Sequence, residues 1–426
     1  MTFELKPKRF PRIFDQRIAK EVHDEFLESS EKLNFFFAAV ASCSPYLYSQ
    51  ILKEKDWLLK TISDKNFDIL SLLEPLKSET FESLFFKLRI AKRRAALWIA
   101  LNDLADTWSL EEVTKNLSEF AEKAINLSWR ASFLKELRKG KFPKHYDSNP
   151  DKVGFFILAM GKLGAYELNY SSDVDLICFF DEEVFRPEEF QDVRRVFINA
   201  TKNLHRILSE NGADGYVFRT DLRLRPDPSV TPVCMGVDAA ERYYASLGRT
   251  WERAAFIKAR VCAGDHSAGI KFLKNMEPFV WRKYLDYAAI SDAHDIRLRI
   301  RDHYKTKNGE ITLPKHNMKL GRGGIRDIEF FTQTHQIIFG GKDKTIRTRA
   351  TIRSLREIAN KKWLPKNLVK DLIENYRFHR KIEHRLQMIN DAQTHELPNS
   401  DQGFVRLACL MGAEKDDLQK ELVDRL

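Results

Sequence analysis

The stretch AMGKLGAYELNYSSDVDLICFF, residues 159–180, places two glycines and two aspartates between two apolar segments. The run VGFFILAM (153–160) that leads into it is short and apolar, which predicts a buried strand, and DVDLICFF (173–180) predicts a second one. Gly161 and Gly164 permit a tight turn between them, and KLGAYEL can open a helix whose free N–H groups favour an anionic phosphate. The segment therefore predicts the centre of a small α/β unit.

Strand geometry predicts how the side chains of the two aspartates are oriented. Side chains at i and i+2 share a face, so we expect Asp173 and Asp175 to point the same way while Val174 and Leu176 point into the core. A helix is predicted over PEEFQDVRRVFINATKNLHRILSENG and a third strand over GYVFRTDLRLRPD. One face of that third strand would carry Arg219, Asp221, Arg223 and Arg225. If the strands are neighbours, Asp221 adds a third carboxylate to the same patch.

Three neighbouring carboxylates repel one another unless a cation compensates their charge. Mg²⁺ is the expected ion, because it binds carboxylate oxygens together with substrate phosphates. One or two such ions can hold the attacking and leaving oxygens of a phosphoryl displacement, and Lys162 can add a point charge on the upstream side. A lone Asp-x-Asp pair is most often structural, whereas the glycine turn, the gap and the later aspartate together favour a phosphoryl-transfer site.

Helical patterns surround this unit. Residues 16–140 are typical of helices, and Ser109 and Glu112 form a capping box at the start of the last of them. After residue 232 helices are predicted over 237–262, 265–284, 287–306, 324–339, 349–361 and 366–391. The order strand, strand, helix, strand within so many helices predicts an α+β protein that is mostly α. We expect three domains, at residues 1–145, 146–262 and 263–426.

The composition limits the classes of function. The 426 residues are 43% hydrophobic and 12% aromatic, which argues against disorder. The net charge of +10 fits phosphates, nucleotides or an acidic partner, and equally a solvated basic surface. Five scattered cysteines without a Cys-x-x-Cys pair predict a reducing compartment. Since no signal peptide, membrane-length apolar run, Walker motif or aromatic stacking platform is present, we expect a cytoplasmic protein that contacts neither membrane nor nucleic acid.

The segment GKLGAYELNYSSDVDLICFF resembles the signature of the glutamine synthetase adenylyltransferases, which belong to the nucleotidyltransferase superfamily of the DNA polymerase β type. The stretches RTDLRLRPD, WERAAFIKAR, KLGRGGIRDIEFFTQ and DAQTHELP agree with that family and follow in the same order. The resemblance covers about residues 153–412. It implies a polymerase-β-like nucleotidyltransferase core with a small mixed sheet, flanked by helical domains.

That family carries two related nucleotidyltransferase domains in one bifunctional chain. The N-terminal domain removes AMP from a tyrosine of glutamine synthetase, and the C-terminal domain adds it. Here the motif follows about 150 residues of helix, so the resemblance implies the N-terminal, deadenylylating half, with residues 263–426 completing the site and starting the link to a missing C-terminal half. The implied reaction is phosphorolysis, which gives ADP and unmodified, active glutamine synthetase and so regulates nitrogen metabolism. A PII-type signalling protein is a further candidate partner.

The resemblance also implies roles for single residues. Asp173 and Asp175 would bind one or two Mg²⁺ ions, and Asp221 would be the third catalytic carboxylate and metal ligand. Phosphate or nucleotide (ADP or ATP) would be held by Gly161, Lys162, Ser172, Arg219 and Arg223. Further residues expected to face the site are Arg253, Lys258, Arg322, Arg326 and Glu329, with Arg260 beside them. No organic cofactor is expected.

Other charged clusters have plainer interpretations. GRGGIRDIEF (321–330) precedes a helix, and its charges fit an ordinary helix start as well as a site. The arginines of RLRIRDHYK (297–305) scatter around a helix and favour a solvated surface. His379 and His384 have the wrong spacing for a helical zinc site, so we expect no zinc. Their neighbours Tyr376, Phe378, Ile382 and Leu386 are predicted to be core.

Two alternatives stay open. The same carboxylates would serve adenylyl transfer from ATP to a protein, small-molecule or RNA acceptor, because the motif determines the chemistry better than its direction. A non-catalytic regulatory module that senses a nucleotide or a PII-type protein is the alternative of another class.

Overall fold

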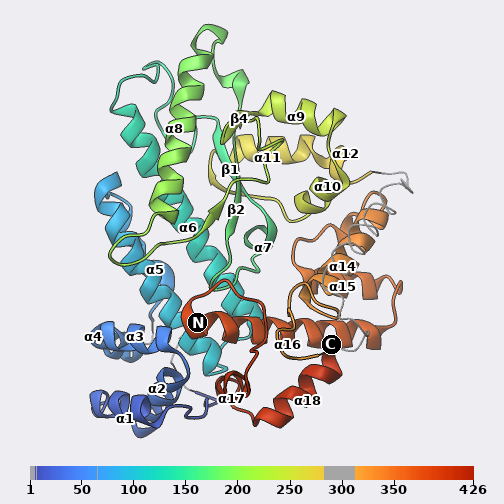
Figure 1. Ribbon diagram of the computed structural model, residues 1–426. Helices are drawn as coiled ribbons and strands as arrows, with labels where there is room; N and C mark the ends of the chain where they lie inside the picture. Colours follow the sequence, from blue (N-terminus) through green and yellow to red (C-terminus); the bar gives the residue numbers. More distant parts are fainter. Residues whose placement is uncertain (1–4, 6, 65, 283–311) are drawn as a thin grey trace.

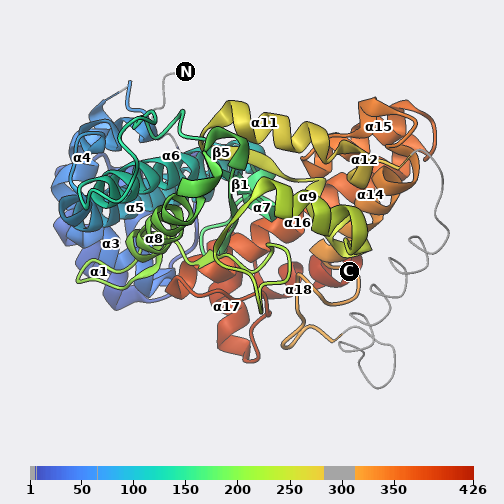
Figure 2. The ribbon, with the colours of Figure 1, turned by 90° about the horizontal axis from the view of Figure 1, so that it is seen from above.

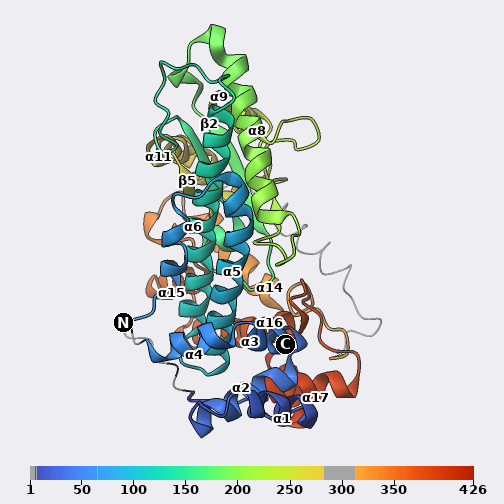
Figure 3. The ribbon, with the colours of Figure 1, turned by 90° about the vertical axis from the view of Figure 1, so that its left-hand side faces the viewer.

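The computed structural model describes residues 5, 7–64, 66–282 and 312–426. The first third of the chain is helical, and its two longest helices pack side by side along the molecule (Figures 1 and 3). The second of them begins with the predicted capping box, in which Ser109 and Glu112 bond to each other's backbone N–H groups. The helices are α1 (Gln16–Glu25), α2 (Glu31–Cys43), α3 (Pro45–Lys53), α4 (Lys55–Ser63), η1 (Ile69–Leu72), η2 (Glu74–Leu76), α5 (Phe81–Leu104) and α6 (Leu110–Leu137).

A five-stranded mixed sheet forms the centre. Its order is β3-β2-β1-β5, with β4 also paired to β2. β1 and β2 are antiparallel, with Phe155 opposite Phe180 and Ala159 opposite Leu176, whereas β3 and β4 run parallel to β2. The strands are β1 (Phe155–Ala159), β2 (Val174–Phe180), β3 (Thr220–Asp221), β4 (Cys234–Gly236) and β5 (Arg260–Gly264). The helical elements between them are α7 (Gly161–Gly164), η3 (Glu182–Val184), η4 (Pro187–Glu189), α8 (Phe190–Ser209), α9 (Val237–Ser246) and α10 (Thr250–Phe256).

Helices cover both faces of the sheet, so β1 is apolar along its whole length and β2 is apolar except at Asp175. Alternate residues of β1 and β2 face α5, α6 and α8, where Trp129 stacks on Phe155 with ring centroids 3.7 Å apart. The intervening residues, such as Phe156 and Phe179, pack against α9, α10 and α11 (His266–Asn275) in a second cluster. Figure 2 shows this layering from above. The N-terminal helices α5 and α6 therefore pack on the sheet.

The last part of the chain is again helical and packs below the sheet in Figure 1. α16 contacts α3 and α6, and α17 contacts α2, so residues far apart in sequence lie side by side. None of the helices in the described ranges combines the length and apolar character needed to cross a membrane. α12 (Glu277–Val280) lies beside the sheet and contacts α10 and α11. The elements below the sheet are α14 (Ile325–Phe339), η5 (Lys344–Ile346), α15 (Thr351–Asn360), α16 (Lys366–Asn390), α17 (Asp401–Leu410) and α18 (Lys415–Arg425).

The mostly helical α+β fold is confirmed, and so are the helices predicted at 324–339, 349–361 and 366–391. The single helix predicted over 237–262 is wrong, because the structure forms α9, α10 and then β5. In that segment Val261 opposes Leu158 of β1 in the ladder, so strand pairing overrides the helix-forming residues before it. The helix predicted over 265–284 is divided into α11 and α12. The helix predicted over 287–306, with its three arginines, lies outside the described residues, and the domain boundaries stay predictions.

The predicted third strand is also much shorter than GYVFRTDLRLRPD. Only Thr220 and Asp221 pair with β2. The Asp221 carboxylate then accepts a hydrogen bond from the backbone N–H of Arg223 at 2.8 Å, and the Arg225 guanidinium donates to the carbonyl of Leu222. Such local bonds between side chain and backbone turn the chain out of a ladder.

The turn after β1 is packed too tightly for any side chain at Gly164. A Cβ there would overlap the carbonyl oxygen of Lys258 and lie 2.6 Å from that of Ala159. We expect Gly164→Ala to lower the free energy of unfolding by about 2–3 kcal/mol, since both obstacles are backbone atoms. Gly140→Ala is the control, because its φ of +70° is unfavourable but its surroundings are empty, so about 1 kcal/mol is expected. Urea unfolding of both variants measures the difference, and equal losses would contradict this packing argument.

Candidate active site

The aspartates at the start of β2 lie beside the aspartate of β3. The two strands pair in parallel, with Val174 opposite Thr220 and Asp175 opposite Asp221. Asp173 directly precedes β2, two residues from Asp175. The expectation that these strands are neighbours is confirmed, and the backbone brings three aspartates to one end of the sheet.

Two arginines compensate the outer carboxylates. Arg219 Nε lies 3.3 Å from Asp173 Oδ1, and Arg223 Nη2 lies 2.6 Å from Asp221 Oδ2. The hydrogen bond from Arg223 lowers the pKa of Asp221. Asp175 has no ion pair within the described ranges, and burial together with the charges of Asp221 and Asp173 raises its pKa to about 6. Phosphate binding by the two arginines stays a prediction, since here both hold carboxylates.

The glycine turn is shaped around Asp175. Gly161 has a φ of +53°, and a Cβ at this position would lie 2.7 Å from Asp175 Oδ2. The backbone N–H of Met160 donates to the carbonyl oxygen of Asp175 at 2.9 Å. The segment KLGAYEL forms only the single turn α7, much shorter than the helix expected there. Gly161 therefore serves the close approach of a carboxylate to backbone.

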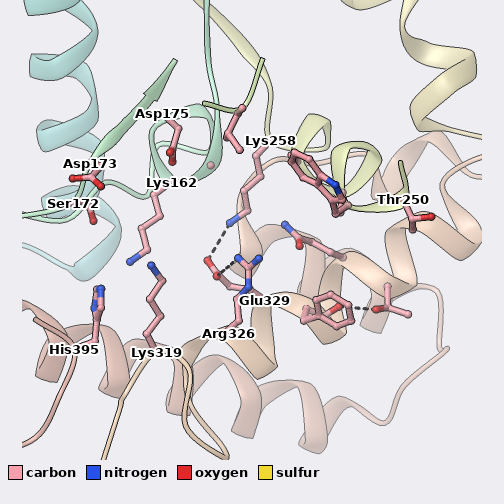
Figure 4. Close-up of a pocket in the computed structure, with 18 of the residues that line it drawn as sticks. Lys162, Ser172, Asp173, Asp175, Thr250, Lys258, Lys319, Arg326, Glu329 and His395 are labelled. Carbon is pink, nitrogen blue, oxygen red and sulfur yellow. Dashed lines mark hydrogen bonds and ion pairs between the residues drawn. The ribbon is translucent and has the colours of Figure 1, made fainter. Parts of the chain in front are cut away.

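A cavity of about 330 Å³ opens beside Asp173 and Asp175, and Figure 4 shows it in close-up. One end is charged: Lys162 and Lys319 reach it from opposite sides, near His395. The other end lies between α10 and α14 and is mostly apolar. It is lined by Leu224, Thr250, Trp251, Ala254, Ala255, Phe330, Gln333, Thr334 and Ile337.

Lys162 is held at the charged end by a buried carboxylate. Its Nζ lies 3.1 Å from Glu383 Oε1, and the same oxygen is 2.8 Å from His395 Nδ1. Burial lowers the pKa of Lys162 to about 8 even though Glu383 opposes that shift. Burial alone would raise the pKa of Glu383, but Lys162, His395 and Arg380 hold it well below its usual value. Lys319 has no carboxylate within ion-pairing distance among the described residues, so it is the cation left over for an anionic ligand.

A second ion-pair chain crosses the middle of the cavity (Figure 4). Lys258 Nζ lies 2.9 Å from Glu167 Oε2 and 3.2 Å from Glu329 Oε1, and Arg326 lies 3.8 Å from Glu329 Oε2. Burial would lower the pKa of Lys258, but the two glutamates raise it above its ordinary value. Burial would raise the pKa of Glu329, but Lys258 and Arg326 lower it to about 2.

The residues expected to face the site thus divide into two groups. Lys258, Arg326 and Glu329 line the cavity together with Gly161, Lys162, Ser172, Asp173 and Asp175. Of the described residues, neither Arg253 nor Arg322 lines it, and Arg253 is buried near the carbonyl of Val280. Asp221, Arg219 and Arg223 line an adjacent groove instead.

Sequence reasoning missed the residues of α16 that support the motif. Tyr376, Phe378, Ile382 and Leu386 are buried as predicted, but the polar residues between them are buried too. Arg380 donates to the carbonyl of Glu167 and to Asn169, and Gln387 accepts from the N–H of Ser171. Arg380, Glu383, His384 and Gln387 recur at i, i+3, i+4 and i+7, which is one helix face. The available signal was a row of polar residues at helical spacing that lies beside the apolar positions predicted to be core.

Comparison with known proteins agrees with this architecture. A family model described as glutamate-ammonia ligase adenylyltransferase matches residues 36–275, and one described as GlnD PII-uridylyltransferase matches residues 294–426. Three relatives carry the name bifunctional glutamine synthetase adenylyltransferase/adenylyl-removing enzyme. The relative from Bradyrhizobium sp. (strain BTAi1) is 42% identical over 382 residues, 88% of this chain and 39% of its own. The relative from Rhizobium meliloti (strain 1021) is 49% identical over 329 residues, which are 77% of this chain and 33% of its own.

The third relative, from Bartonella quintana (strain Toulouse), is 43% identical over 388 residues, 89% of this chain and 40% of its own. The chain therefore spans well under half the length of the relatives it matches. The adenylyltransferase model nevertheless covers more than half of this chain, including all five strands and the three aspartates. The chain belongs to the glutamate-ammonia ligase adenylyltransferase family.

Proposed function

We propose that this chain removes AMP from an adenylylated tyrosine of glutamine synthetase by phosphorolysis. The observation that carries the proposal is the two-ended cavity beside Asp173 and Asp175. Its charged end suits phosphate groups, and its apolar end, with the amide of Gln333, suits a purine base. A volume of about 330 Å³ is that of a small-molecule site. Glutamine synthetase, a PII-type partner and a cytoplasmic location are parts of the same proposal.

The donor set fits Mg²⁺, although the third carboxylate is engaged elsewhere. No group of three or more His, Cys, Asp or Glu side chains among the described residues is arranged to hold a metal ion, since Asp221 turns to Arg223 and Asp173 to Arg219. Mg²⁺ commonly needs only one or two carboxylates besides phosphate oxygens and water. The raised pKa of Asp175 marks negative charge that protein cations leave uncompensated. We therefore assign Asp173 and Asp175 as ligands, joined by Asp221 once it leaves Arg223.

The proposed reaction balances without a redox partner. An oxygen of hydrogen phosphate attacks the phosphorus of adenylyl-tyrosine, the bond from phosphorus to the tyrosine oxygen breaks, and the phosphate proton goes to that oxygen. The products are ADP and tyrosine. Bound Mg²⁺ would neutralise charge on the phosphoryl oxygens. Lys319 and Lys162 would attract the incoming phosphate, and Ser172 would bond a phosphoryl oxygen.

The direction of the reaction rests on the resemblance to the N-terminal half of the family, where the motif also follows a helical region. Adenylyl transfer from ATP remains the alternative, because the same carboxylates would serve it. Incubation with adenylylated glutamine synthetase, phosphate and Mg²⁺ tests the proposal. Formation of ADP supports it, whereas pyrophosphate from ATP with unmodified glutamine synthetase, and no ADP from phosphate, would establish adenylyl transfer from ATP instead.

We expect Asp175→Asn to lower kcat for ADP formation at least about 100-fold, because the variant loses a proposed ligand of the Mg²⁺ that would neutralise charge in the transition state. Asp56→Asn on the exposed face of α4 is the matched control and should leave kcat unchanged. Steady-state ADP release with both variants measures the effect. If the two variants released ADP equally fast, Asp175 would have no catalytic role, and the regulatory binding module would become the better interpretation.

The pKa of Asp175 predicts a pH-dependent stability of the metal-free protein. Its folded value of about 6 exceeds the ordinary 3.8, so the folded state binds the proton more tightly. The stabilising contribution of the protonated form is complete below pH 4 and is lost as the pH rises through 6. With EDTA at pH 7.5, urea unfolding should therefore give Asp175→Asn a free energy of unfolding about 2–3 kcal/mol higher than that of the wild type. Near pH 4 the free energies of unfolding of the two proteins should converge. A difference that does not change between these pH values would contradict this prediction.

Trp251 is exposed to 40% and lines the apolar end of the cavity. If a purine base occupies that end, Trp251→Ala should weaken ADP binding about tenfold, since stacking of a base on an aromatic ring contributes about 1–3 kcal/mol. Phe86→Ala on α5, another exposed aromatic residue, is the control and should bind ADP as the wild type does. Calorimetric titration measures both affinities, and an unchanged affinity of Trp251→Ala would place the base elsewhere.

A further inference from the structure

A groove of about 580 Å³ lies beside the nucleotide cavity and shares Asp173 and Gln393 with it. Asp175 lines only the cavity, and Asp221 lines only the groove. These two aspartates are register partners on β2 and β3. Asp173, Asp175 and Asp221 therefore lie at the boundary between the cavity and the groove.

The outer wall of the groove is positively charged. Lys202 and His205, three residues apart on α8, are exposed and form no ion pair with the described residues. Arg219 and Arg223 complete the lining, and each faces one aspartate. Because no carboxylate of the described residues pairs with Lys202, the groove favours an acidic ligand.

The loop after β3, which contributes Leu222, Arg223 and Val233 to the lining of the groove, is held by internal hydrogen bonds. The Arg225 guanidinium donates to the carbonyls of Leu222, Pro228 and Thr231 at 2.8, 3.0 and 2.9 Å. This fixes the loop that follows β3, and Val230 in that loop is 77% exposed. A loop with so many internal bonds that still presents an apolar side chain is suited to contact a partner.

Displacement at phosphorus requires the entering and leaving oxygens on opposite sides of the phosphorus atom. If the cavity holds the nucleotide and the incoming phosphate, the tyrosine oxygen must depart on the other side of the carboxylates, which is the groove. A single phosphate ion would leave most of a 580 Å³ groove empty, whereas an extended peptide would fill it.

We propose that this groove, lined by Lys202, His205, Arg219, Arg223 and the loop after β3, binds an acidic segment of the partner protein that carries the adenylyl-tyrosine. This inference rests on the proposed function, because it takes the adenylylated protein as the substrate.

The test measures binding of a short glutamate-rich peptide that carries O-adenylyl-tyrosine and a fluorophore, without metal or phosphate so that no reaction occurs. We expect the double variant K202E/H205E to bind the peptide at least about tenfold more weakly, with a smaller dependence on salt, while it binds ADP as the wild type does. Lys20→Glu on α1, an exposed lysine at the far end of the molecule, tests whether a charge reversal away from the groove has the same effect. Unchanged ADP binding also shows that the double variant is folded.

Equal peptide affinities for wild type, K202E/H205E and K20E would overturn the docking proposal. So would a double variant whose KM for adenylylated glutamine synthetase equals that of the wild type. Failure of the proposed function looks different: the wild type would release no ADP from adenylylated glutamine synthetase and phosphate, whereas peptide binding would still decide the groove. If the double variant instead loses affinity for inorganic phosphate alone and not for the peptide, the groove is a phosphate site and the docking proposal is wrong.

Discussion

The carboxylate of Glu383 is completely buried, and the arrangement of the site depends on how its charge is compensated. Lys162 from the turn after β1, His395 from the segment after α16, and Arg380 from α16 itself all lie within 3.3 Å of it. A buried charge without such partners costs several kcal/mol. The ion pairs therefore fix α16 beneath the glycine turn and hold that turn against Asp175. The end of the sheet that carries the three aspartates is positioned by a helix more than 200 residues further along the chain.

The requirement that charges near the cavity be paired also explains why Asp175 differs from the residues around it. The structure pairs nearly every other charge around the cavity and the adjoining groove: Lys258 with two glutamates, Glu383 with three cations, and Asp173 and Asp221 with one arginine each. Asp175 is half-buried beside two like charges with no ion pair among the described residues. A carboxylate in that position raises its own pKa unless a ligand brings positive charge. A carboxylate without an ion pair, among charges that are nearly all paired, is the physical mark of a binding site.

The sequence predicted the parts of the site that follow from short-range rules. Strand alternation placed Asp173 and Asp175, and turn chemistry explained Gly161. The neighbouring position of Asp221 followed from treating its segment as a strand, although only two residues of that segment are one. The polar face of α16 could not be assigned, because whether a charged helix face meets water or a buried partner depends on tertiary packing. The strand β5 was mistaken for helix for the same reason, since only its pairing with β1 makes it a strand.

The ion pairs Arg219–Asp173 and Arg223–Asp221, between the cavity and the groove, differ in how easily a bound cation could break them. An arginine keeps its charge at any accessible pH, so Asp173 and Asp221 cannot be freed by titration of their partners. The Arg223 side chain is 81% exposed, however, and an exposed ion pair is worth only about 0–1 kcal/mol. Arg219 is more constrained, since it also donates to Tyr216 and to the carbonyl of Ser171. A cation or an acidic peptide can therefore draw Arg223 away from Asp221 at little cost, while Asp173 stays fixed between the cavity and the groove.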